Sequence, residues 1–137
     1  MVKRRRGSRA ARRSVPARHV PFERVVADVV ARIPPPFDRA LDEVAIVIED
    51  EPDERQRREN ELEPENTMYG LYEGVPRTDY GADWAAAPNR ITLFRLPLQE
   101  DFPDPRDLEA EVRMTVLHEL AHHLGIDDDR LDELGAS

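Results

Sequence analysis

The chain of 137 residues is long enough for one domain with a modest core and too short for two. It contains no cysteine, which excludes disulfides, thiolate metal sites and cysteine nucleophiles, so a tightly bound metal would need histidine or carboxylate ligands. The net charge of −9 is unevenly divided, because the first 18 residues hold eight of the 20 basic residues and none of the 29 acidic ones.

Residues 1–20 are a basic arm of low complexity. Dense charge with few apolar side chains cannot compensate for the entropy lost on ordering, so we expect a disordered arm and a folded domain over residues 21–137. The alternative is that the arm contacts nucleic acid or another acidic partner. The acidic character of the rest of the chain argues against nucleic acid as the main partner.

Neither a membrane span nor a secretion signal is predicted. The chain has no stretch of about 18 apolar residues. A secretion signal needs an uninterrupted apolar segment after its basic start, and Pro16, His19 and Pro21 stand there instead. We therefore expect a cytoplasmic protein with no membrane partner.

The first predicted element is an amphipathic helix, ended by the three prolines at 34–36. Its apolar face consists of Phe22, Val25, Val26, Val29, Val30 and Ile33. Residues 44–48 are rich in β-branched side chains and predict a buried strand. Charge dominates residues 49–66, which we expect to be an exposed connection with one helical turn near 55–62.

Two further strands and a long helix follow. Residues 69–75 predict a strand punctuated by glycines, and residues 91–96 predict a strand closed by Pro97. The helix has Asp104 as its N-cap, Pro105 at its first position and Gly125 as its left-handed stop, with Ile126 folding back in a Schellman-type contact. Its apolar residues recur at helical spacing: Leu108, Val112, Val116, Leu117, Leu120, Ala121 and Leu124.

This helix carries the sequence His118-Glu119-Leu120-Ala121-His122. Positions i and i+4 of a helix differ by about 40° of rotation and about 6 Å of rise, so both imidazoles can meet one ion. Zinc accepts imidazole nitrogen readily, and a catalytic zinc site keeps one position open for water. Glu119 lies about 100° around the helix, where it can contact that water without being a ligand. We therefore predict zinc bound by His118 and His122, with Glu119 as the general base toward a metal-activated water.

The spacing continues to Gly125 and Asp128, which gives the pattern HExxHxxGxxD. Glycine ends the helix and turns the chain, so the residue three positions later can return to the metal, and we predict Asp128 as the third ligand. Acids just past a helix C-terminus are electrostatically disfavoured, and a bound cation would remove that penalty. The alternative is that an aspartate caps the short helix that follows. We assign that capping role to Asp127 and keep Asp132 and Glu133 as fallback ligands.

Other side chains near the motif have open roles. His123 points away from the two ligands and is expected at the surface, with support of Glu119 as the alternative. Thr115 and Glu111 lie on the His118 face one and two turns back, where one of them can hydrogen-bond a ligand imidazole. Three tyrosines are candidates for stabilising an oxyanion, or alternatively for packing: Tyr69, Tyr72 and Tyr80.

The chain resembles the small bacterial minimal zincins, which are zincin-like metallopeptidases. The resemblance rests on residues 70–76, 90–94 and 112–125 with the acidic stretch beyond, and it covers residues 21–135. It implies an α+β fold in which a small mixed β-sheet packs on two main helices, with a short C-terminal helix. It also implies a zinc site of His118, His122 and the aligned acid Asp128. Metzincins proper have a third histidine and a later methionine turn, and this chain has neither.

The residues and the resemblance together favour a zinc metallopeptidase that hydrolyses peptide bonds in a peptide or protein substrate. The alternative is a zinc-containing binding or regulatory module without proteolytic activity. Glu119 distinguishes the two, because a structural zinc site prefers four protein ligands and does not need a glutamate at that position. We expect an extended substrate to pair with an edge strand formed by residues 91–96.

Overall fold

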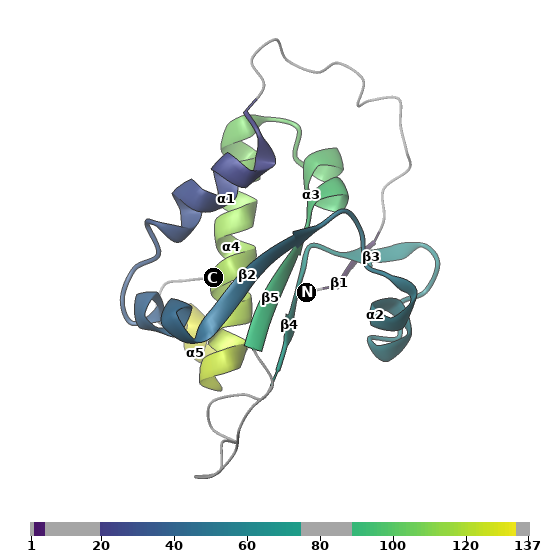
Figure 1. The fold of residues 1–137 in the computed structure, drawn as a ribbon. Helices are drawn as coiled ribbons and strands as arrows, with labels where there is room; N and C mark the ends of the chain where they lie inside the picture. Colours follow the sequence, from purple (N-terminus) through teal and green to yellow (C-terminus); the bar gives the residue numbers. More distant parts are fainter. Residues whose placement is uncertain (1, 5–19, 75–88, 134–137) are drawn as a thin grey trace.

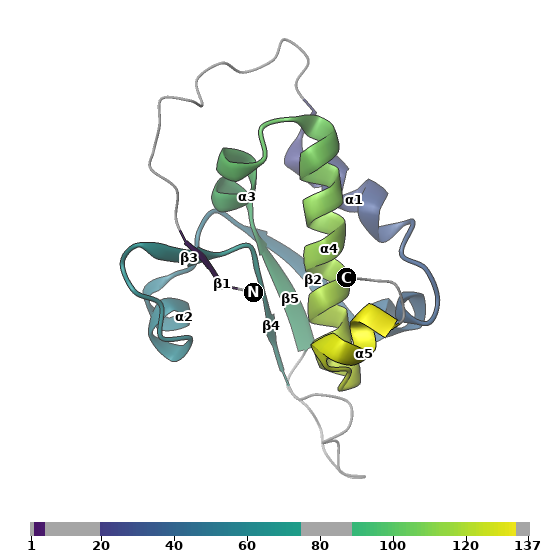
Figure 2. The ribbon, with the colours of Figure 1, turned by 180° about the vertical axis from the view of Figure 1, so that it is seen from behind.

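The computed structural model describes residues 2–4, 20–74 and 89–133, and its architecture is α+β (Figure 1). A mixed sheet of three strands lies against helices that cover one of its faces, as the view from behind shows (Figure 2). The fold class expected from the sequence is therefore confirmed. None of the helices in the described ranges combines the length and the apolarity that crossing a membrane requires.

Helix α1 (Phe22–Val30) forms where the apolar periodicity predicted it. Its buried face packs into the core beside α4, and Ile33 continues that face beyond the end of the helix. The chain then turns at the prolines, where the Pro34 carbonyl accepts the N–H of Phe37. A 3₁₀ helix, η2 (Phe37–Glu43), follows and leads directly into the sheet.

The sheet has the strand order β2 (Val44–Glu49), β5 (Asn89–Phe94), β4 (Gly70–Glu73). Strand β5 pairs in parallel with β2 and antiparallel with β4, so that Ile91 lies between Ile46 and Tyr72. Our expectation of a substrate-binding edge at residues 91–96 is therefore wrong. Strand β5 has a neighbour on both sides, and Ile91, Leu93 and Phe94 are completely buried. A central strand has no unpaired backbone groups to offer a peptide.

The outer strand of the sheet continues backwards into β3 (Asn66–Met68), with Tyr69 between β3 and β4. Strand β1 (Val2–Arg4) pairs antiparallel with β3, with Lys3 opposite Thr67. For these three residues our expectation of a disordered arm is wrong, because backbone pairing with a distant strand orders them without needing an apolar core of their own. The prediction for residues 5–19 lies outside the described ranges.

Two short helices flank the sheet. Helix α2 (Glu54–Glu59) forms within the charged connection and begins with a capping box made by Asp53 and Gln56. Helix α3 (Arg95–Asp101) follows β5 directly, so the expectation that Pro97 closes a strand is wrong. Pro97 is the third residue of α3. The first-turn N–H groups of a helix have no partner within the helix, which is why proline is tolerated there.

Helix α4 (Pro105–Leu124) crosses the face of the sheet, and the short helix α5 (Asp128–Glu133) follows it (Figure 2). The predicted caps of α4 are confirmed. Asp104 accepts the N–H groups of Arg106 and Asp107, and Gly125 adopts the left-handed conformation with φ 75°. The N–H of Ile126 donates to the Ala121 carbonyl at 2.8 Å, which completes a Schellman motif and sets the direction of the chain toward α5.

Strand β4 lies very close to α4 at one point. A Cβ atom at Gly70 would come within 2.5 Å of Thr115 Cγ2, so only glycine allows the strand to approach the helix at this distance. Thr115 is three residues before His118 and completely buried. The close approach therefore places the backbone of β4 beside the part of α4 that carries the HExxH motif.

Candidate metal centre

The last two turns of α4 carry the three residues of the HExxH motif, His118, Glu119 and His122. They lie under β4, where the helix approaches the strand most closely. The side chain of His122 is 74% exposed, whereas that of Glu119 is only 5% exposed. The motif thus lies at the boundary between core and solvent, with its two histidines one helical turn apart.

The structure places one ring nitrogen of each motif histidine. Nδ1 of His118 is buried, and Nδ1 of His122 lies 3.7 Å from Glu119 Oε1. Zinc accepts a neutral imidazole through either ring nitrogen, so both side chains are chemically suitable ligands.

Glu119 is held on the outer side of β4. Its Oε1 accepts the backbone N–H of Tyr72 at 3.0 Å, which fixes the carboxylate relative to the strand. Burial raises the pKa of Glu119 and the neighbouring His122 imidazole lowers it, and the resulting pKa lies below its ordinary value. A carboxylate that is almost completely buried and yet ionised has the properties of a proton acceptor at neutral pH.

Asp127 and Asp128 follow the Schellman turn. Asp127 Oδ1 accepts the N–H of Arg130 at 2.9 Å, so the prediction that Asp127 caps α5 is confirmed. Asp128 is the first residue of α5, and its side chain lies outside the described part of the structure. In the described ranges, no three His, Cys, Asp or Glu side chains form a group that could hold a metal. The assignment of Asp128 as third ligand therefore stays a prediction.

His123 is completely buried, so our expectation of a surface histidine is wrong. Its Nδ1 lies 2.9 Å from the Tyr72 hydroxyl and its Nε2 lies 2.7 Å from Glu43 Oε1. The helix turns this side chain toward η2 and β4, which cover it. Sequence spacing shows which side of the helix a residue occupies, but it does not show which distant element packs on that side.

Of the two tyrosine candidates that the structure describes, Tyr72 lies beside the motif. Its ring centroid lies 6.2 Å from that of His122, and its hydroxyl lies 3.1 Å from Asn89 Oδ1 as well as near His123. The Tyr69 hydroxyl instead donates to Asp101 at the end of α3. Tyr80 lies outside the described ranges.

Thr115 does not support a ligand imidazole as the sequence suggested. Its Oγ1 has no hydrogen-bond partner within the described part of the chain, and its methyl group lies against Gly70. Sequence reasoning also missed Glu43 and Asn89. Glu43 ends η2 and Asn89 begins β5, so each is far from the motif in sequence and only the fold brings them to His123 and Tyr72.

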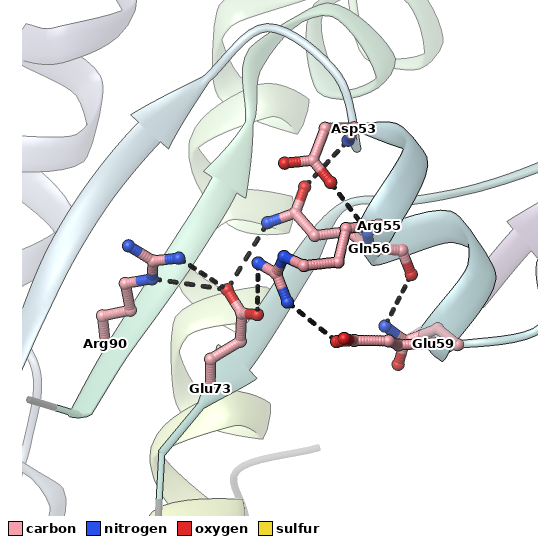
Figure 3. Close-up of polar contacts among 7 residues, drawn as sticks. Asp53, Arg55, Gln56, Glu59, Glu73 and Arg90 are labelled. Atoms are coloured by element: carbon pink, nitrogen blue, oxygen red, sulfur yellow. Dashed lines mark hydrogen bonds and ion pairs between the residues drawn. The ribbon is translucent and has the colours of Figure 1, made fainter. Parts of the chain in front are cut away.

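The end of β4 is fixed by a cluster of charged side chains around Glu73 (Figure 3). Glu73 accepts hydrogen bonds from Arg55 at 3.0 Å and from Arg90 at 3.1 Å, and the buried Gln56 lies 3.4 Å away. This cluster joins α2, β4 and β5. It therefore holds the strand that donates to Glu119 against both of its neighbours.

A family model described as zincin-like metallopeptidase matches residues 41–136. The match covers more than half of the chain and includes the HExxH motif, β4 and the buried histidine. No curated protein matches the chain.

Proposed function

This chain belongs to the zincin-like metallopeptidase family, and we propose that it is a zinc-dependent peptidase that uses Glu119 as its general base. Zinc is the usual cofactor of this family. In our proposal His118 and His122 would hold the ion, and Asp128 would supply the third ligand. The donor set fits zinc, which accepts imidazole nitrogen and carboxylate oxygen and needs three protein ligands at a catalytic site.

The observation that carries the proposal is the environment of Glu119. A carboxylate that is 4% exposed loses most of its hydration, which destabilises the fold unless other groups compensate. Here a backbone N–H and an adjacent imidazole compensate, and the carboxylate lies beside His122. A purely structural metal site would not need an ionised side chain at this position.

Zinc and Glu119 would have different roles in hydrolysis. A zinc ion, when bound, would polarise the substrate carbonyl and acidify water. We assign proton acceptance from the attacking water to the carboxylate of Glu119, whose Oε1 accepts the Tyr72 N–H. The same carboxylate would then deliver the proton to the amine that leaves when the peptide bond breaks. Burial of the carboxylate keeps its position fixed between the two transfers.

We further propose that the substrate lies along the outer edge of β3 and β4 as an extended strand. Strand β1 supports this mode, because its antiparallel pairing with β3 indicates that this edge accepts a strand. Continuing the register from Val2 opposite Met68 leads toward Tyr72, whose N–H lies beside Glu119. Backbone pairing of this kind binds a peptide with few demands on its side chains.

The experiment that tests the proposal is the substitution Glu119→Gln. The amide keeps the size of the side chain but cannot accept a proton at neutral pH. We expect hydrolysis to fall by about 10²–10⁴-fold, the usual contribution of a positioned acid–base group. Zinc content, measured on the same sample, should stay at the wild-type level because Glu119 is not a ligand.

Two results would contradict the proposal. Loss of zinc in the Glu119→Gln variant would make Glu119 part of the metal-binding structure. Absence of hydrolysis by the zinc-loaded wild-type chain across a broad peptide library would favour the alternative of a zinc-containing binding or regulatory module.

A further inference from the structure

His123 is a completely buried polar side chain to which the proposed reaction gives no direct role. Both ring nitrogens contact other side chains, Nδ1 the Tyr72 hydroxyl and Nε2 the Glu43 carboxylate. A carboxylate only accepts hydrogen bonds, so Nε2 of His123 carries a hydrogen and donates it to Glu43. Glu43 thus fixes the orientation of the His123 ring.

Tyr72 connects this buried histidine to the proposed general base. Its hydroxyl lies between His123 Nδ1, at 2.9 Å, and Asn89 Oδ1, at 3.1 Å. Its backbone N–H donates to Glu119 Oε1 at 3.0 Å. Tyr72 therefore contacts His123 and Asn89 through its side chain, and it contacts the proposed general base, Glu119, through its main chain.

The anchoring matters because Tyr72 lies on the open side of β4. Among the described strands of the three-stranded sheet β4 pairs with β5, and the N–H of Tyr72 points to the other side. A shift of the strand at this residue would change the distance and angle at which Glu119 meets its donor. The contacts of the Tyr72 hydroxyl fix the strand at this residue.

We propose that Glu43, His123 and Tyr72 form a positioning chain that holds the Glu119 carboxylate in the orientation from which it accepts a proton. An apolar side chain in place of His123 would fill the core as well, but it would give the Tyr72 hydroxyl no polar partner in a fixed position. The predicted effect on hydrolysis rests on the proposed peptidase function. The predicted effect on the hydrogen bond from the Tyr72 N–H to Glu119 does not depend on that function.

The test compares Tyr72→Phe with Tyr69→Phe in the full-length, zinc-loaded chain. Each substitution removes one tyrosine hydroxyl group, and the Tyr69 hydroxyl donates to Asp101 at the end of α3. We expect Tyr72→Phe to lower kcat about tenfold, the low end of the range for groups that orient a catalytic site, with KM changed less than twofold. Tyr69→Phe should leave both constants close to wild type.

Amide hydrogen exchange at residue 72 supplies a readout that needs no activity. Loss of the hydroxyl anchor should speed exchange of this N–H about tenfold, because its hydrogen bond to Glu119 opens more often. In Tyr69→Phe the exchange rate at residue 72 should not change. If the wild-type chain hydrolyses no peptide, the peptidase proposal fails, and this exchange rate still decides the positioning proposal.

Two substitutions of Glu43 test whether it acts by accepting a hydrogen bond from His123 or only by filling space. Glu43→Gln keeps an acceptor oxygen for His123 Nε2 and should retain most of the wild-type kcat and exchange protection. Glu43→Ala removes the acceptor and should behave like Tyr72→Phe. The proposal is overturned if Tyr72→Phe and Tyr69→Phe are alike in kcat and in exchange at residue 72, or if both Glu43 variants behave like wild type.

Discussion

Asp127 and Asp128 are neighbouring carboxylates with separate roles in our account. Asp127 caps α5 through the N–H of Arg130, whereas Asp128 is the proposed third zinc ligand. We expect Asp128→Ala to weaken zinc binding by more than about a hundredfold, since losing a direct ligand should exceed the 10–100-fold typical of groups that only orient ligands. Zinc affinity is measured by competition with a chelating dye.

The matched control is Asp127→Ala. It should lower the free energy of unfolding by about 1 kcal/mol through loss of the N-cap and leave zinc affinity unchanged. Wild-type zinc affinity in the Asp128→Ala variant would contradict the assignment and direct attention to Asp132 and Glu133.

At the scale of single residues, the sequence predicted what depends on spacing along one helix. The relation of His118, Glu119 and His122 follows from helical geometry alone, and so do the caps at Asp104 and Gly125. The burial of His123 could not be predicted in this way. It depends on Glu43 and Tyr72, which η2 and β4 bring to the same place from distant parts of the chain.

Helices and strands were likewise predictable where their sequence signals are local and not where they depend on distant parts of the chain. Helices α1 and α4 were predictable because their apolar periodicity and their end signals are local. Helix α3 was missed because Pro97 reads as a strand terminator, although it is equally acceptable in a first helical turn. The central place of β5 depends on parallel pairing with β2 and antiparallel pairing with β4, and these long-range pairings leave no local signal.

The cluster that joins α2 to the sheet gives a prediction about pH. Burial raises the pKa of Glu73, but the hydrogen bonds from Arg55 and Arg90 outweigh it and hold the pKa below its ordinary value. Because the folded pKa is lower than the unfolded one, the ionised group stabilises the fold at neutral pH. That stabilisation is lost as the pH falls below about 4.3 and through the folded pKa.

We therefore expect Glu73→Gln to lower the free energy of unfolding at pH 7 by about 1 kcal/mol, a value reduced by the solvent exposure of both arginines. The difference from wild type should shrink as the pH is lowered from 5 to 3, as measured by urea unfolding. Glu59→Gln is the control, since Glu59 pairs with the same Arg55 at an exposed position and should change stability little. A difference for Glu73→Gln that is independent of pH would show that its charge is not the cause.

At the scale of the whole molecule, a basic arm is attached to an acidic domain, and the first described part of that arm pairs with the edge proposed for the substrate. We expect a chain truncated to begin at Pro21 to melt within about 3 °C of the full-length chain, since the described pairing that it loses involves three residues of the arm. If that pairing contributes about 1 kcal/mol, the apparent KM for a peptide should fall about fivefold when the edge is released. Melting is followed by circular dichroism and KM by steady-state hydrolysis.

The substitution Lys3→Pro in the full-length chain tests whether strand pairing or the charge of the arm changes KM. Proline interferes with strand pairing while seven of the eight basic residues remain, so KM should fall toward that of the truncated chain. An unchanged KM in both variants would mean that β1 does not occupy the substrate edge. A large loss of stability on truncation would show that the arm is part of the folded domain.

The proposed peptidase function requires that zinc bound at the HExxH helix supports hydrolysis. The most direct measurement is a zinc titration of chelator-treated protein with peptide hydrolysis as the readout. We predict that the metal-free chain is inactive and that activity returns in proportion to added zinc, up to one ion per chain. His122→Ala, which lacks a proposed ligand, should recover no activity over the same range. Hydrolysis that persists without zinc, or a His122→Ala variant that titrates like wild type, would contradict the account.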